Sequence, residues 1–220
     1  MSPLEARWRS WKGAESNPNR GRALTRPTGL CEDAWRVGMN LVAGIDPGLS
    51  GALFFLDPAD STIGEAIDLP VHLLKRGGRN KREPDIASLA GILASRRPGH
   101  AFVEQVGAMP RQGVSSMFAF GKCYGAILGV LTALAIPITL VPAVRWKRAL
   151  GVQKSKDAAR ARASQLMPAA ASQWGRKRDD GRAEAALLAL YGARQLHGSP
   201  APPGIPATET IPVLAALRDD

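Results

Sequence analysis

The stretch LVAGIDPGLSG, residues 41–51, decides the fold, because an apolar run ends in an acid and the chain then turns at once. The apolar run is typical of a buried strand, and the Pro-Gly pair after Asp46 indicates a turn. Asp46 is therefore expected at the carboxyl end of a strand, where open α/β sheets present ligand-binding groups. An ordinary Asp-Pro-Gly turn has the same sequence, so the stretch needs support from elsewhere in the chain.

A second acid ends another apolar run, HAFVE, which covers residues 100–104. If the two strands are neighbours, Asp46 and Glu104 lie close together at one edge of the sheet. Carboxylates that close repel each other and raise each other's pKa unless a cation neutralises them. A hard cation with oxygen ligands is the economical solution, so the two strand ends predict a metal site.

The third acidic segment is RKRDDGRAEA, residues 176–185. Asp180 and Glu184 are four positions apart and therefore share one face at the start of a helix. Acids at the start of a helix also interact favourably with the helix dipole and can cap the helix. Helix capping alone is therefore a second interpretation of Asp180 and Glu184. The basic run immediately before them favours a site that a phosphate backbone approaches.

The remaining pattern predicts strands first and helices later, in one α/β domain. Three short apolar runs form a meander, and helices then alternate with two more strands. Predicted strands cover residues 41–45, 52–56, 62–69, 100–104 and 138–141. Predicted helices cover residues 84–96, 115–135 with Ser115 as cap, a short basic segment opened by Pro142, a segment with Lys154 and Lys156 at its start, and 180–196.

Two features of the long apolar helix need separate interpretation. Residues 123–144 carry no charge and are numerous enough to span a bilayer, but Pro137 and Pro142 favour a buried helix followed by a buried strand. We therefore expect no membrane span. Glycines recur at every fourth position of the helix, which predicts a smooth stripe for close packing of another backbone. These glycines are Gly121, Gly125 and Gly129.

The chain of 220 residues, 45% of them hydrophobic, is long enough for one full core. Its formal charge of +10 favours a phosphate-rich partner, and nucleic acid is the first expectation. Cys31 and Cys123 are the two cysteines, too few for a disulfide framework, so a reducing cytoplasm is expected.

Both ends of the chain differ in composition from its centre. Residues 1–38 mix Arg, Gly, Pro and Trp without periodicity, and we expect a flexible basic arm with no signal-peptide pattern. The arm is either an extension that contacts DNA or a segment upstream of a native start at Met39. It holds seven of the 29 basic and four of the 19 acidic residues, so the rest of the chain is still positive by seven. Residues 198–220 are expected to form a Pro-rich tail after a folded domain at 39–197.

Taken in order, these segments resemble the RuvC-type Holliday-junction resolvases, in particular short versions from phages and prophages. The resemblance runs from VAGIDPGLSGALFFLD through AFVEQVGAMPRQGVSSMFAFGKCYGAILGVL and IPITLVPAVRWKRALG to SKDAARARASQLMP and RDDGRAEAALLALYGAR. It implies a ribonuclease H-like mixed five-stranded sheet flanked by helices. It also implies a homodimer that hydrolyses phosphodiester bonds in branched DNA.

The resemblance further implies that four carboxylates hold two Mg²⁺ or Mn²⁺ ions. Carried onto this sequence, these are Asp46, Glu104, Asp180 and Glu184. Familiar bacterial resolvases separate the last two acids by three positions rather than four, which leaves Asp179 as a competing ligand. They also have an aromatic residue shortly after the second acid that helps to open the junction.

At that position this sequence has no aromatic residue, so Met109 or Phe118 would have to serve, or opening works differently.

Several basic residues are candidates for contacts with the DNA backbone, although each is equally a solvated surface charge. Trp146 is expected in the core rather than as a stacking platform. The histidines show no ligand spacing and receive no role. The candidate DNA contacts are Arg111, Lys147, Lys154, Lys156 and Arg176.

Three other functions remain open. A transposase or recombinase relative would share the acidic cluster, but such proteins usually carry further domains. An actin-like or sugar-kinase-like ATPase can have a phosphate loop similar to GIDPGLSG, but it needs a second loop that the sequence lacks. A non-catalytic DNA-binding module of the same fold would not need four converging acids.

Overall fold

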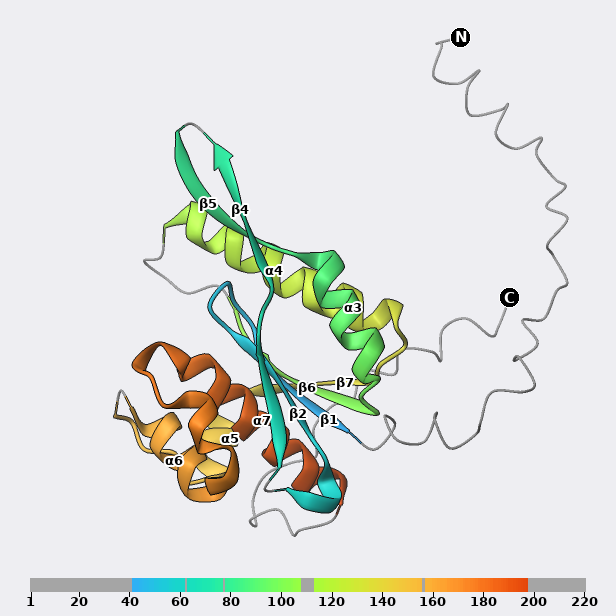
Figure 1. Ribbon diagram of the computed structural model, residues 1–220, viewed down its shortest axis with the longest axis vertical. Helices are drawn as coiled ribbons and strands as arrows, with labels where there is room; N and C mark the ends of the chain where they lie inside the picture. Colours follow the sequence, from blue (N-terminus) through green and yellow to red (C-terminus); the bar gives the residue numbers. More distant parts are fainter. Residues whose placement is uncertain (1–40, 62, 77, 108–112, 156, 198–220) are drawn as a thin grey trace, which may run out of the picture. The chain divides into compact units, whose positions relative to one another are not determined.

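The computed structural model describes residues 41–61, 63–76, 78–107, 113–155 and 157–197. Its centre is a five-stranded sheet in the order β3-β2-β1-β6-β7 (Figure 1). β1 is antiparallel to β2 and parallel to β6, β2 is antiparallel to β3, and β6 is parallel to β7. The predicted α/β, ribonuclease H-like mixed sheet is therefore confirmed. The strands are β1 (Val42–Asp46), β2 (Ala52–Leu56), β3 (Gly64–Asp68), β6 (His100–Gln105) and β7 (Ile138–Pro142).

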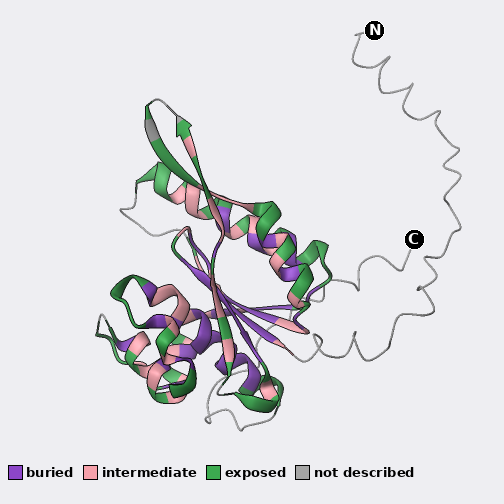
Figure 2. Cartoon of the chain, in the orientation of Figure 1, coloured by how far each residue is buried: buried purple, intermediate pink, exposed green. Residues whose placement is uncertain are grey.

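Helices cover both faces of the sheet, because successive residues of the central strands point to opposite sides. Val42 packs into one core cluster with Trp146 and Leu187, whereas Ala43 packs into another with Leu93 and Ile127. Figure 2 shows the buried sheet between the two helical layers. The helices are α3 (Ile86–Arg96), α4 (Val114–Ala133), α5 (Ala143–Ala149), α6 (Ala158–Leu166) and α7 (Asp180–Leu196), with short 3-10 turns at η1 (Pro58–Asp60), η2 (Pro168–Trp174) and η3 (Lys177–Asp179).

α7 crosses the centre of the sheet, and its close approach depends on Gly44 in β1. A Cβ at Gly44 would lie 2.1 Å from the carbonyl oxygen of Ala185 and 2.3 Å from the amide nitrogen of Ala189. Both atoms belong to the helix backbone, so α7 would have to move away from the strand. Gly44 thus fixes the height of α7 over β1, and with it the position of the acidic residues in the first turns of the helix.

Several predicted boundaries are wrong by a few residues. α3 begins at Ile86 rather than at residue 84, because the Asp85 side chain accepts a hydrogen bond from the amide of Ser88 at 3.0 Å and caps the helix. Ser115 does not cap α4, which begins at Val114 after Gly113 without a side-chain cap. Lys154 precedes α6 rather than opening it. The predicted arm at 1–38, the tail at 198–220, Met109, Arg111 and Lys156 lie outside the described residues.

A β-hairpin that the pattern did not predict separates β3 from α3. It consists of β4 (Val71–Arg76) and β5 (Arg79–Pro84), which pair antiparallel as a two-stranded sheet of their own. The hairpin projects beyond the start of α4 in Figure 1. The Gly77-Gly78 pair between two runs of six residues is a recognisable hairpin signal, but these runs are basic and lack apolar alternation.

The uncharged stretch at 123–144 is divided as predicted between the end of α4 and β7. By length and composition, α4 is the one helix among the described residues that could cross a membrane. Its Cys123, Ile127 and Leu131 pack against α3 and the sheet. The glycine stripe behaves differently from the prediction, because a Cβ on any of its three glycines would meet nothing within 4 Å in the described chain.

Candidate active site

Asp46 is the last residue of β1, and the loop after it folds back tightly. The amide of Gly51 donates to the carbonyl of Gly48 at 3.0 Å, and a Cβ on Gly51 would lie 2.0 Å from the Asp46 carbonyl oxygen. The first turn of α7 also lies against Asp46, because a Cβ on Gly181 would be 2.9 Å from its Oδ2 atom. Two glycines therefore allow the loop and the helix to enclose this carboxylate.

Glu104 reaches the same edge of the sheet from β6. The parallel register pairs Ile45 with Val103, so Glu104 follows Val103 as Asp46 follows Ile45. The two strands are therefore neighbours, which is the condition on which the predicted metal site depended. Trp146 of α5 is fully buried and donates from Nε1 to Oε2 of Glu104 at 3.0 Å. The expectation that Trp146 lies in the core is also correct, and the bond to Glu104 is an additional role that the pattern did not indicate.

Glu184 joins these acids from the second turn of α7. Its Oε1 accepts a hydrogen bond from Nζ of Lys147 at 2.8 Å, and the same ammonium lies 4.9 Å from the centre of the Trp146 ring. The α5 helix thus supplies two adjacent residues to the site. Trp146 donates a neutral hydrogen bond to Glu104, and Lys147 forms an ion pair with Glu184.

The electrostatics of the site follow from this convergence. Burial, then the charges of Glu184 and Glu104, raises the pKa of Asp46 well above its usual range. Burial, then the charge of Glu184, also raises the pKa of Glu104, although the Trp146 bond opposes the change. Burial lowers the pKa of Lys147, but its bond to Glu184 and the neighbouring acids outweigh burial and raise it. Three acids from β1, β6 and α7 therefore interact electrostatically with one another and with Lys147.

The donor set suits a hard divalent cation, because it consists of carboxylate oxygens whose repulsion a cation would relieve. As they stand, no three His, Cys, Asp or Glu side chains in the described ranges are grouped closely enough to hold an ion. The bond from Lys147 engages the Glu184 carboxylate. A cation bound here would therefore have to compete with the lysine for Glu184.

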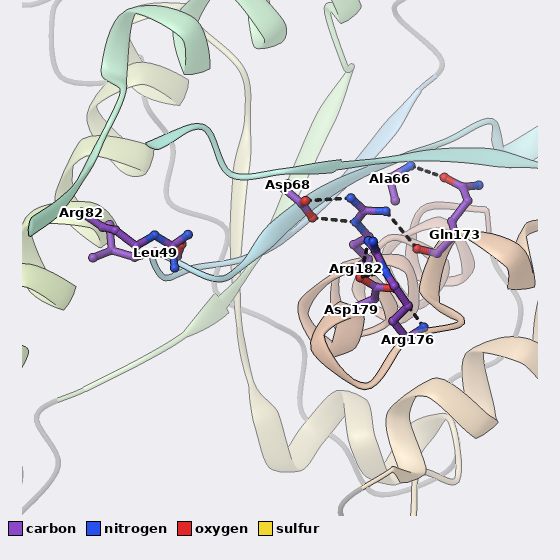
Figure 3. Close-up of polar contacts among 8 residues, drawn as sticks. All are labelled: Leu49, Ala66, Asp68, Arg82, Gln173, Arg176, Asp179 and Arg182. Carbon is purple, nitrogen blue, oxygen red and sulfur yellow. Dashed lines mark hydrogen bonds and ion pairs between the residues drawn. The ribbon is translucent and has the colours of Figure 1, made fainter. Parts of the chain in front are cut away.

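Asp180 and Asp179 differ from the other acids in their contacts. The Asp180 carboxylate accepts from Nε of Arg160 at 2.7 Å, which directs it toward α6. Asp179 is buried and accepts from the backbone amide of Arg176 at 3.0 Å and from its guanidinium at 2.9 Å (Figure 3). The Arg176 bonds lower the pKa of Asp179. Neither aspartate joins the cluster of Asp46, Glu104 and Glu184 in this structure.

Basic side chains line one cavity at Glu184 and another at the loop that follows Asp46. A cavity of about 550 Å³ is lined by Lys147, Arg148, Lys154 and Glu184. A second cavity, of about 370 Å³, is lined by Ser50, Arg82, Arg176 and Arg178, among others. Two of the predicted DNA contacts, Lys147 and Lys154, thus share the first cavity, and Arg176 lies at the second. Phe118 is 72% exposed on α4.

Comparisons with known proteins give a likeness of fold. No protein-family model matches the chain, and no curated protein matches it. Among solved structures, RuvC of T. thermophilus in complex with Holliday junction substrate has a TM-score of 0.48 at 20% identity, covering 72% of this chain and 96% of that one. A second Thermus thermophilus RuvC structure has a TM-score of 0.46 at 17% identity, with the same coverage. A likeness at this level concerns the fold and says nothing of activity.

Sequence reasoning missed two groups of residues at the site. Trp146 and Arg148 flank the predicted Lys147, but nothing in a short basic helix indicates which side chain will bond to an acid. Arg82 lies in the unpredicted hairpin, and it donates to the carbonyl of Leu49 and the hydroxyl of Ser50. The register of β5 is what brings Arg82 to the loop after Asp46, and a register is not visible in sequence.

Proposed function

We propose that this chain is a divalent-metal-dependent endonuclease that hydrolyses phosphodiester bonds in branched DNA, such as Holliday junctions. The observation that carries the proposal is the meeting of Asp46, Glu104 and Glu184 from two strands and a helix, with one basic cavity at Glu184 and another at the loop after Asp46. An acidic cluster alone would repel DNA, whereas basic flanks bring the phosphate backbone to it.

The proposed ligands of Mg²⁺ or Mn²⁺ are Asp46, Glu104 and Glu184. When bound, such an ion supplies a Lewis acid beside the phosphate and lowers the pKa of water. The family resemblance implies two ions and a fourth ligand, Asp180, which would have to leave Arg160 to take part. Trp146 keeps one oxygen of Glu104 in a fixed direction, as outer partners of ligands commonly do.

Lys147 has the clearest role among the basic residues. Its raised pKa keeps it protonated at neutral pH, so it provides a fixed positive charge at the rim of the acidic cluster. In the free protein this charge neutralises Glu184. We propose that it moves to a phosphate of the DNA when a cation takes over Glu184. Arg148 and Lys154 in the same cavity would hold adjacent phosphates.

We also propose that the chain acts as a homodimer, so that two active sites cut two strands. The support is the unoccupied glycine stripe of α4, because small residues allow a second helix to approach closely. Val114 and Phe118 are exposed at the start of the same helix. Light scattering should give twice the mass of one chain, and Gly125→Leu should give the mass of one chain.

The cleavage experiment uses a panel of labelled DNAs: a four-way junction, a fork, a flap and a linear duplex. In Mg²⁺ or Mn²⁺ the wild type should cut a branched substrate, and Asp46→Asn and Glu184→Gln should reduce the rate at least a hundredfold. Asp46→Asn should still bind the junction. Glu65→Gln is the matched control, because it removes an exposed carboxylate on β3 away from the site. Equal cutting by the wild type and Asp46→Asn would remove the proposed mechanism.

A further inference from the structure

We propose that the β4–β5 hairpin is a DNA-binding arm, and that the face carrying Lys75 and Arg82 holds the phosphate backbone of one duplex arm beside the active site. This inference rests on the proposed function for the identity of the ligand. It assigns a role to a segment that neither the acidic cluster nor the basic cavity at Lys147 uses.

The hairpin is strongly basic, and three of its described cationic side chains are exposed. Residues 71–84 contain five basic residues and one acid. That acid, Glu83, forms an ion pair with Lys122 of α4, so its charge is compensated at the base of the hairpin. Lys75, Lys81 and Arg82 are all exposed. A projecting ribbon with this charge attracts a polyanion rather than another basic surface.

The pairing register separates the hairpin into two faces. Leu73 pairs with Arg82 and Lys75 pairs with Asn80, so these four residues share one face. Lys81 lies on the opposite face, because it pairs with Leu74 and is two residues from Glu83. Glu83 is bonded to α4, so the Lys81 face is the one directed toward that helix. The Lys75 face is directed away from it.

Arg82 connects the Lys75 face to the active-site loop. Its guanidinium donates to the hydroxyl of Ser50 at 3.1 Å and to the carbonyl of Leu49. Both residues belong to the loop that follows Asp46, and both acceptors are uncharged. The bonds therefore hold the hairpin at the active site and leave the positive charge of Arg82 available for a phosphate.

The basic surface continues from Arg82 into the cavity of about 370 Å³ between the loop and η3. Arg178 lines this cavity, and Figure 3 shows Arg82 with Leu49 on one side and Arg176 with Asp179 on the other. The two acids at the cavity are already paired: Asp179 with Arg176, and Asp68 with Arg182 at 2.6 Å. A phosphate entering it would meet mainly cationic groups.

DNA fits this surface better than a protein partner does. Leu73 is the exposed large apolar side chain of the hairpin, and one such residue is too little for the apolar centre of a protein interface. A two-stranded ribbon is also narrow enough to lie along a DNA groove. Contacts to phosphates carry no sequence information, which suits an enzyme that selects branched shape rather than sequence.

The test compares two lysines of the same hairpin by fluorescence anisotropy with a labelled four-way junction in metal-free buffer. Lys75→Gln should remove one phosphate contact and lower the slope of log affinity against log salt by about 0.9. The loss of affinity between 50 and 200 mM salt should then be smaller by roughly three- to fourfold. Lys81→Gln makes the same change of charge on the other face and should leave the slope unchanged.

Equal slopes for the wild type and Lys75→Gln would overturn the inference, and so would equal effects of the two substitutions. A wild type that binds no junction DNA would overturn it as well. Because no cutting is needed, the result is separate from the cleavage experiment. A protein that binds through Lys75 but never cuts with Mg²⁺ or Mn²⁺ would refute the proposed nuclease and leave the hairpin assignment in place.

Discussion

Replacing Trp146 with phenylalanine removes one hydrogen bond from the acidic cluster while keeping an aromatic ring in the core. In the wild type the indole Nε1 donates to Oε2 of Glu104 at 3.0 Å, and the ring has an exposed fraction of 0%. The variant therefore leaves Oε2 of Glu104 without this donor. The bond lowers the pKa of Glu104, so the variant should have an even higher Glu104 pKa than the wild type.

The expected cost has two parts. A hydrogen bond to a charged group contributes about 1.5–3 kcal/mol, and the lower half of this range applies because Glu104 is only partly buried. The smaller ring leaves about 40 Å³ unfilled, which costs about 1 kcal/mol. Trp146→Phe should therefore lower the free energy of unfolding by about 2.5–3.3 kcal/mol at pH values above the pKa of Glu104. The loss should shrink as the pH falls and Glu104 becomes protonated in both proteins.

Trp174→Phe is a matched control, because Trp174 is 1% exposed and its Nε1 donates to the neutral hydroxyl of Ser164 at 3.0 Å. Urea unfolding between pH 5 and pH 8 should give this variant a nearly constant loss of about 2 kcal/mol. Mn²⁺ titration should show affinity reduced roughly 10–100-fold by Trp146→Phe and unchanged by Trp174→Phe. Identical pH dependence in the two variants would refute the role of Trp146 at Glu104.

Two further predictions test the electrostatics and the packing. The raised pKa of Asp46 means that its ionised form opposes folding. Asp46→Asn should therefore stabilise the metal-free protein in urea unfolding, by an amount that grows from pH 5 to pH 8. A stabilisation that fell with rising pH would contradict the repulsion between Asp46 and its neighbouring acids. Gly44→Ala should cost about 3 kcal/mol or more because its Cβ meets the backbone of α7, whereas Gly91→Ala, with open space in α3, should gain about 0.5–1 kcal/mol. Equal urea midpoints for these two would show that α7 does not rest on Gly44.

Much of the fold could be predicted because its central strands are buried on both faces. Such strands are nearly continuous apolar runs, as ALFFL in β2 shows, and turn residues separate them clearly. The acids at the ends of β1 and β6 could be placed together because parallel neighbours end at the same edge. Glu184 followed from helical spacing and from the resemblance to the resolvases.

The rest depended on contacts that have no pattern in sequence. Asp180 and Glu184 share a helix face, but Arg160 of another helix bonds to Asp180. The β4–β5 hairpin is exposed and basic, so it has no apolar period to reveal it. The glycine stripe of α4 predicts close packing, yet the described chain supplies no partner for it. For Asp180, the outcome depends on a tertiary neighbour that helical spacing does not reveal.

The most direct measurement of the central claim is calorimetric titration of Mn²⁺ into the wild type and into three single variants. Asp46→Asn and Glu184→Gln should each weaken Mn²⁺ binding at least tenfold, because each removes an oxygen ligand and a charge from the same cluster. Glu65→Gln, which changes an exposed acid on β3, should bind Mn²⁺ like the wild type. Binding that is insensitive to Asp46 and Glu184, or equally sensitive to Glu65, would contradict a metal centre at this edge of the sheet.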